Sequence, residues 1–125
     1  MSEPLKLLIV DDSNVIRRKI ERAQENSRFQ VVGSASSGAE ALEKFNQLSP
    51  DIVTMDLTMP HMDGIECIGH LMALKPELRI LVISALSDKA TGIEALEQGA
   101  QGFLCKPFDD NELSSALKEL VDSDE

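Results

Sequence analysis

Five side chains in this sequence could share one chemical reaction, because each of them follows a short apolar run. They are Asp11, Asp12, Asp56, Ser84 and Lys106. Short runs of apolar and β-branched residues are typical of buried strands. Desolvating an unpaired carboxylate costs on the order of several kcal/mol, so an acid at the end of such a strand needs a partner. If the strands are parallel, their carboxyl ends lie at one edge of the sheet and the five groups converge on one crevice.

The charges of these groups indicate what else the crevice would hold. Two unit charges about 4 Å apart interact by roughly 4 kcal/mol at an effective dielectric constant of about 20. Three carboxylates with one lysine therefore need a further cation, and oxygen ligands select Mg²⁺, with Mn²⁺ as a possible substitute. Asp56 is then a candidate nucleophile that forms an acyl phosphate. Ser84 would donate a hydrogen bond to one phosphoryl oxygen, and Lys106 would pair with another.

Each of the five residues also has an ordinary structural interpretation. An Asp or Ser at the end of a strand commonly forms a turn, and Asp11-Asp12 before a helix could be a cap favoured by the helix dipole. Lys-Pro is common in loops. The convergence of all five residues on one edge favours the chemical interpretation over five separate structural ones.

The elements that would position these residues alternate regularly along the chain. Strands are expected at residues 5–10, 29–33 (an outer strand), 52–55, 79–83 and about 101–105, each followed by a helix. Capping boxes predict helix starts at Ser37, Asp63 and Asp109. Five strand-helix units predict a parallel sheet with helices on both faces. Gly92 lies inside the weakest helix, residues 88–98, where it marks either an element that moves or a tolerated surface position.

Composition excludes several classes of protein. The 125 residues suit one domain, and the net charge of 12 − 22 = −10 argues against nucleic acid or an anionic membrane as a partner. No apolar run approaches the ~20 residues of a membrane span, and the first residues do not form a signal peptide, so a cytoplasmic location is expected. Cys67 and Cys105 are isolated and are interpreted as small buried apolar residues.

Four motifs together carry a family resemblance. They are Val10-Asp11-Asp12, the stretch Met55–Gly64, Ser84-Ala85 and Lys106-Pro107-Phe108. In this order they resemble the receiver domain of two-component response regulators, and above all single-domain chemotaxis regulators of the CheY type. The resemblance covers roughly residues 5–121. It implies an α/β, flavodoxin-like doubly wound (βα)5 fold with a parallel five-stranded sheet in the order 2-1-3-4-5, and residues 1–125 as a single receiver domain.

The resemblance also implies a role for each acid. Asp56 matches the phosphoacceptor, which takes a phosphoryl group from the phosphohistidine of a histidine kinase. Asp12, Asp56 and the backbone carbonyl of Thr58 match the Mg²⁺ ligands, and Asp11 acts through water. Such a protein catalyses its own phosphorylation and slow dephosphorylation, and it is not a turnover enzyme.

The remaining matched positions concern the switch. Ser84 and Lys106 match the contacts to phosphoryl oxygens, the Lys106-Pro107 bond is expected to be cis, and Phe103 matches the rotating aromatic residue. The family more often has Thr at position 84, and CheY-type members often have Tyr at position 103. Phosphorylation would reshape the face formed by helix 4, strand 5 and helix 5, which would bind a downstream protein, while the domain stays monomeric or forms a weak dimer.

Three alternatives remain open from the sequence. A haloacid-dehalogenase-type phosphatase also uses a strand-end Asp, but it needs a second acid two residues later as the general acid, and here that position is Thr58. A pure interaction module would leave the pocket unused. A receiver cut from a larger transcriptional or enzymatic regulator would have the same sequence pattern.

Overall fold

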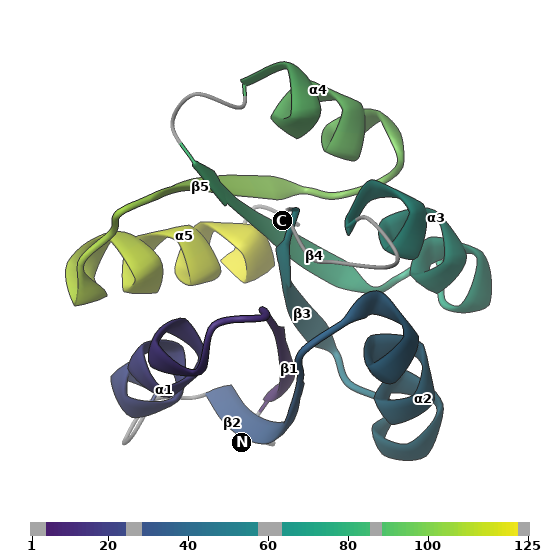
Figure 1. Ribbon diagram of the computed structural model, residues 1–125, viewed down its shortest axis with the longest axis horizontal. Helices are drawn as coiled ribbons and strands as arrows, with labels where there is room; N and C mark the ends of the chain where they lie inside the picture. The colour runs from purple at the N-terminus through teal and green to yellow at the C-terminus, as the bar shows by residue number, and fades with distance from the viewer. Residues whose placement is uncertain (1–4, 25–28, 58–63, 86–88, 123–125) are drawn as a thin grey trace.

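Strands and helices alternate throughout the described part of the chain (Figure 1). The computed structural model describes residues 5–24, 29–57, 64–85 and 89–122. The strands are β1 (Leu5–Val10), β2 (Phe29–Ala35), β3 (Ile52–Asp56), β4 (Arg79–Ala85) and β5 (Gly102–Lys106). The helices are α1 (Asn14–Ala23), α2 (Gly38–Leu48), α3 (Gly64–Leu74), α4 (Lys89–Glu97) and α5 (Asp110–Asp122).

The five strands form one parallel sheet in the order β2-β1-β3-β4-β5, which confirms the predicted fold class. The chain moves outward from β1 to β2 and then returns past β1 to β3. At such a reversal of strand order, the two flanking connections leave in opposite directions and open a crevice at the carboxyl ends of the strands. The crevice between β1 and β3 is where the sequence places its acids.

Helices cover the sheet on both faces (Figure 1). Helices α1 and α5 lie on one face, and α2, α3 and α4 contribute to the layer on the other. Alternate residues of β1 divide between these layers. Leu7 and Ile9 pack under α1 and α5, whereas Leu8 and Val10 pack towards α2 and α3. A strand segment buried on both faces needs apolar residues at every position, which explains why residues 7–10 of β1 form a continuous apolar run that does not alternate.

The predicted capping box at Asp109 is complete, whereas at Ser37 the cap forms but the Glu40 carboxylate bonds to the preceding residue, Ser36. Ser37 Oγ accepts a hydrogen bond from the Glu40 amide at 3.2 Å, and the Glu40 carboxylate accepts one from the Ser36 amide at 2.7 Å. The Ser36 amide and hydroxyl, which both donate to this carboxylate, favour its ionised form and hold the pKa of Glu40 below its usual value. At α5 the pairing is reciprocal, because Asp109 and Glu112 each accept from the other's amide, at 2.8 and 2.9 Å. The third box begins at Asp63, outside the described residues.

Some predicted boundaries and burials were wrong. Ser84 lies inside β4 and does not follow it, because pairing between β4 and β5 continues through Ala85 and Lys106. The outer strand β2 extends two residues beyond Gly33, to Ala35, along the full length of β1. Cys105 is partly exposed and not buried, unlike Cys67, since β5 is an edge strand with a neighbour on one side only.

Gly92 packs against the aromatic ring of Phe103, so its interpretation as a tolerated surface position is wrong. A Cβ atom built at Gly92 would lie 2.1 Å from Phe103 Cε2 and 2.7 Å from Cδ2. The glycine therefore lets α4 approach β5 at the ring. Ile93 and Leu96 of the same helix are exposed over 60% and 43% of their surfaces.

The contact between Gly92 and Phe103 predicts an unusual sign for a helix substitution. Inside a helix, Gly→Ala normally stabilises by about 1 kcal/mol. Gly92→Ala should instead destabilise, by roughly 1–3 kcal/mol, because the methyl group overlaps the ring. With the ring removed, in Phe103→Ala, the same substitution should stabilise by about 1 kcal/mol. Urea unfolding of the four proteins of this cycle measures both effects; a stabilising Gly92→Ala in the presence of Phe103 would contradict the packing.

Candidate functional site

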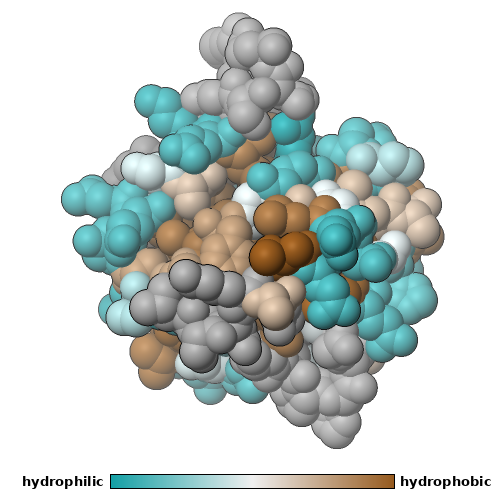
Figure 2. Space-filling view, turned by 90° about the horizontal axis from the view of Figure 1, so that it is seen from above, coloured by the Kyte–Doolittle hydropathy of each residue, from teal (hydrophilic) through white to brown (hydrophobic). Residues whose placement is uncertain are grey.

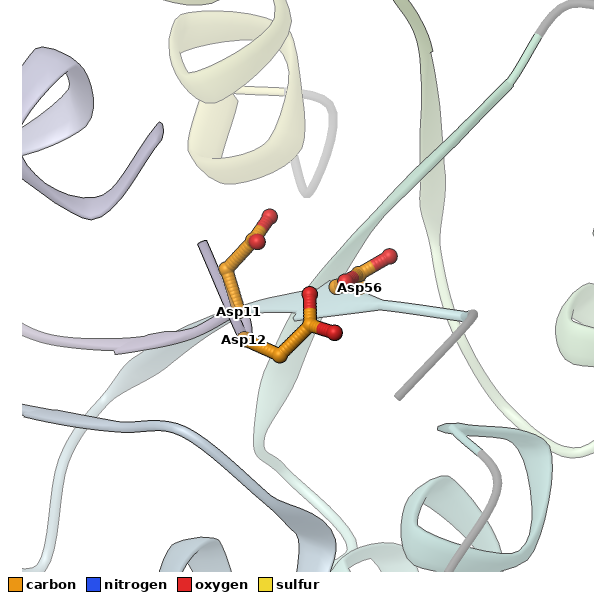
Figure 3. A group of neighbouring side chains, drawn as sticks. All are labelled: Asp11, Asp12 and Asp56. Atoms are coloured by element: carbon orange, nitrogen blue, oxygen red, sulfur yellow. The ribbon is translucent and has the colours of Figure 1, made fainter. Parts of the chain in front are cut away.

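Three carboxylates meet at the carboxyl ends of β1 and β3. Asp11 and Asp12 directly follow β1, and Asp56 is the last residue of β3. One carboxylate oxygen from each residue lies within 4.8 Å of the other two, and Figure 3 shows the three side chains grouped at the ends of these strands. Asp11 and Asp56 are buried, whereas Asp12 is exposed. The site thus has a buried floor and an open side.

Lys106 joins the acids from the opposite side of the crevice. It ends β5, and β4 separates β5 from β3 in the sheet, so its side chain extends over the end of β4. Its Nζ lies 3.2 Å from Asp11 Oδ2 and 3.6 Å from Asp56 Oδ1. One quarter of the lysine side chain is exposed, and both acids are 1% exposed. One ammonium group is therefore shared between two buried carboxylates.

The surroundings of Asp11 act on its ionisation in opposite directions. Burial raises the pKa of its carboxyl group most strongly, and the Asp56 charge raises it further. The Ser13 amide, which donates to Asp11 Oδ1 at 2.9 Å, and the Lys106 ammonium both lower the pKa without cancelling the increase. Three carboxylates and one ammonium leave a formal charge of −3 + 1 = −2. These four side chains together therefore keep a net negative charge.

The other predicted residues are placed differently. Ser84 is buried on β4, one residue beyond Ile83, which pairs with Asp56. Phe103 lies further back on β5, in contact with Gly92, and is not among the charged groups. The Lys106-Pro107 peptide bond is cis. Thr58 lies outside the described residues.

Two basic residues of α1 belong to the site's surroundings and were not predicted. Arg17 Nη1 donates to the backbone carbonyl of Asp11 at 2.6 Å. Lys19 Nζ donates to the backbone carbonyl of Phe108 and lies 4.8 Å from the centre of its ring. Spacing carried a signal for Lys19, because it lies three residues after Ile16 and four before Ala23 on the inward face of the helix. A lysine on an apolar stripe needs a partner.

The donor set suits a hard divalent cation. All three ligating groups are carboxylates, within one ion's reach of each other, and two of them are buried where their mutual repulsion is weakly screened. Magnesium takes oxygen ligands and keeps several waters, which the exposed side at Asp12 allows. The residues present therefore fit a magnesium ion.

Comparison with known proteins assigns the chain to a family. The sequence profile of the response regulator receiver domain matches residues 7–118. The chain belongs to this family. It is similar to the chemotaxis protein CheY of Listeria monocytogenes, with 40% identity covering 94% of this chain and 98% of that one. It is also 40% identical, over 94% of its own length, to a protein-glutamate methylesterase/protein-glutamine glutaminase of Carboxydothermus hydrogenoformans, of which it covers 33%.

A solved structure extends the similarity to the fold. The CheX-CheY-BeF3-Mg²⁺ complex from Borrelia burgdorferi matches with a TM-score of 0.89 and 32% identity, covering 95% of this chain and 90% of that one. The family assignment confirms the resemblance read from the four motifs and makes this a CheY-like receiver domain of a two-component response regulator. This assignment argues against the alternative of a haloacid-dehalogenase-type phosphatase. Among the described helices, none combines the length and hydropathy required to cross a bilayer.

Asp11 should destabilise this receiver domain when metal is absent. A carboxyl group whose pKa is raised on folding binds more protons in the folded state, so stability falls as pH rises through the interval above its ordinary value of 3.8. Asp11→Asn should therefore raise the free energy of unfolding at pH 7 in EDTA, and the gain should disappear below that value. Urea unfolding at several pH values measures the difference.

Mg²⁺ should make the wild type more stable against unfolding than Asp11→Asn, the reverse of their order in EDTA. A ligand that binds only the folded state stabilises it by about 2.7 kcal/mol at one hundred times its dissociation constant, and Asp11→Asn weakens that binding. Wild type should gain more stability from Mg²⁺ than the variant does. An Asp11→Asn protein that is less stable than wild type in EDTA at pH 7 would contradict this account of the site.

Proposed function

We propose that this receiver domain accepts a phosphoryl group on Asp56 from the phosphohistidine of a histidine kinase, in a Mg²⁺-dependent reaction. One observation carries the proposal: Lys106 Nζ lies within 3.6 Å of Asp56 and 3.2 Å of Asp11 in a cluster of three carboxylates. A nucleophilic carboxylate, a cation beside it and a donor set for a divalent ion are the parts that phosphoryl transfer to an acid requires.

The step conserves bonds and charges. An oxygen of Asp56 forms a bond to phosphorus while the bond between phosphorus and the imidazole nitrogen breaks. The electron pair remains on that nitrogen, and the histidine leaves as a neutral imidazole that keeps the proton on its other nitrogen. Lys106 moves its ion pair from the carboxylate to a phosphoryl oxygen, and the Ser84 hydroxyl donates to another. Both groups would then stabilise the negative charge of the phosphoryl oxygens as these approach the carboxylate.

Asp12, Asp56 and the backbone carbonyl of Thr58 would hold the magnesium ion, with Asp11 bound through water. When bound, the ion supplies positive charge for the carboxylates and the incoming phosphoryl group. Mn²⁺ would substitute, because it accepts the same oxygen ligands. The chain's own contribution is to keep Asp11 and Asp56 buried and close together, so that the ion's charge is weakly screened.

The proposed output is a protein contact on the face of α4, β5 and α5. Phosphorylation adds about −1.5 to −2 charges beside Ser84. Movement of β4 towards them changes the space available to Phe103, and its ring contacts Gly92 of α4 directly. Ile93 and Leu96 expose apolar surface on this helix. Figure 2, seen from the side on which α4 lies, shows apolar surface near the middle of that face, which suits a protein partner.

The setting of this reaction is also a proposal. Similarity to CheY proteins supports a chemotaxis-type pathway in the cytoplasm, with a histidine kinase upstream and no direct nucleic-acid or membrane partner. Similarity to part of a methylesterase supports the alternative of a receiver that regulates an attached enzyme or transcriptional domain. In either setting, residues 1–125 act as one phosphoaccepting domain, monomeric or weakly dimeric when phosphorylated, and not as a turnover enzyme.

Small-molecule phosphorylation tests the acceptor directly. Acetyl phosphate with Mg²⁺ should add one phosphoryl group to the wild type, detected by intact mass, and EDTA should prevent it because the charged cluster then repels the donor. Asp56→Asn should remove the adduct. Asp51→Asn is the matched control, since Asp51 lies just before the opposite end of the same strand and pairs with the Lys6 amide.

Three outcomes would contradict the proposal in different ways. An adduct retained in Asp56→Asn would reject Asp56 as the acceptor. No adduct in the wild type would favour a pure interaction module. Steady release of phosphate from a phosphomonoester, without a lasting adduct, would revive the phosphatase alternative.

The output face can be tested without a partner. Beryllofluoride with Mg²⁺ should shift the NMR amide signals of β5 and α4, including those of Phe103 and Gly92, because the ring joins the two elements. Signals of α2 should change little, since that helix packs on the sheet away from this contact. Asp56→Asn is the control for binding at the site. Shifts confined to the residues around Asp56 would reject transmission to α4.

A further inference from the structure

The segment after Lys106 is held by a lysine of a different element. Lys19, in the middle of α1, donates from Nζ to the backbone carbonyl of Phe108. The same ammonium group lies 4.8 Å from the centre of the Phe108 ring. That ring is almost fully buried among the residues that pack under α1 and α5. Lys19 therefore contacts both the main chain and the side chain of Phe108.

The described main chain of this segment has little strand or helix hydrogen bonding, so its other anchors are the buried Phe108 ring and the Lys106 ion pairs. β5 is an edge strand, so Lys106 pairs with Ala85 of β4 on one side and has no strand on the other. Pro107 is exposed and has no N–H group to donate. Regular hydrogen bonding resumes at Asp109, whose carbonyl accepts from the Leu113 amide. The contact from Lys19 bridges the interval between the end of β5 and the start of α5.

We propose that Lys19 is a positioning residue for Lys106. By fixing Phe108, two residues later in the chain, it sets where the Lys106 ammonium lies relative to Asp11 and Asp56. The same helix also holds the acidic side of the crevice, because Arg17 donates to the Asp11 carbonyl at 2.6 Å. Helix α1 thus sets the separation between the acids and the lysine that faces them. The kinetic consequence rests on the proposed phosphotransfer, whereas the structural consequence does not.

The variants separate charge from contact. Lys19→Met keeps most of the aliphatic stem and removes the donor and the charge. Arg18→Met is the matched control, because it removes one positive charge from the neighbouring, exposed position of the same helix. Lys19→Arg should keep the wild-type rate of phosphorylation that Lys19→Met loses, since a guanidinium group can donate to a carbonyl and stack on an aromatic ring.

An NMR measurement tests the positioning without any phosphorylation. In Lys19→Met, the amide signals of Lys106 and Phe108 should shift, and Arg18→Met should leave both unchanged. Signals of Asp12 and Asp56 should change less than that of Lys106. If the Lys106 signal in Lys19→Met matches wild type, the proposal is wrong whatever the kinetics show. If it shifts while the wild type takes no phosphoryl group, the positioning holds and the proposed function fails.

A double-mutant cycle then tests whether Lys19 acts through Lys106. The rate of phosphorylation by acetyl phosphate should fall about tenfold in Lys19→Met, because a small displacement of a charged group from its place in the site is costly. The affinity for Mg²⁺, measured by calorimetry, should stay within about twofold, since the carboxylates are unchanged. In a Lys106→Met background, Lys19→Met should have no further effect on the rate.

The cycle distinguishes positioning from a merely structural role. A loss of general stability would lower the rate by the same factor with and without Lys106, and Lys19→Arg would not need to recover it. Equal factors in the two backgrounds would therefore overturn the proposal. A tenfold loss only in the presence of Lys106, with recovery in Lys19→Arg, supports it.

Discussion

The rest of this structure depends on the repulsion between carboxylates that are held close together. Asp11 and Asp56 are buried at the ends of neighbouring strands, with Asp12 beside them at the surface. Lys106 compensates part of their charge, through ion pairs of 3.2 and 3.6 Å. Burial makes the arrangement costly in the isolated protein and raises the pKa of Asp11. The same burial makes the crevice suited to a divalent cation, whose charge would be weakly screened there.

Such a site needs a scaffold that does not relax. Relief of the repulsion would require the ends of β1 and β3 to separate, but both strands are central in the sheet and packed on both faces by apolar side chains. The cost of breaking that packing exceeds the gain from moving two charges apart. The fold therefore opposes the separation of the acids, and their charge remains available for binding and chemistry.

Two contacts outside the charged cluster connect it to the rest of the molecule. The ring of Phe103 against Gly92 joins β5 to α4, on the side where apolar surface is exposed. The contact of Lys19 with Phe108 joins the end of β5 to α1, on the other face of the sheet. Both contacts act on β5, which is an edge strand and the strand that ends in the site lysine. The contact of β5 with α4 suits the transmission of a signal, and the contact after its end with α1 suits the alignment of the charged groups.

The sequence by itself determined the fold and the charged residues of the site. Short continuous apolar runs that end in polar residues are typical of buried strands, and their alternation with helices predicts a parallel sheet whose carboxyl ends converge. Tertiary structure alone decided how Lys19, Gly92 and Phe103 are used. These roles depend on contacts between elements far apart in the chain, at distances set by helix packing; the spacing of Lys19 places it on the inward face of its helix but does not name the residue that it contacts. The exposure of Cys105 is also a tertiary effect, because β5 has a neighbouring strand on one side only.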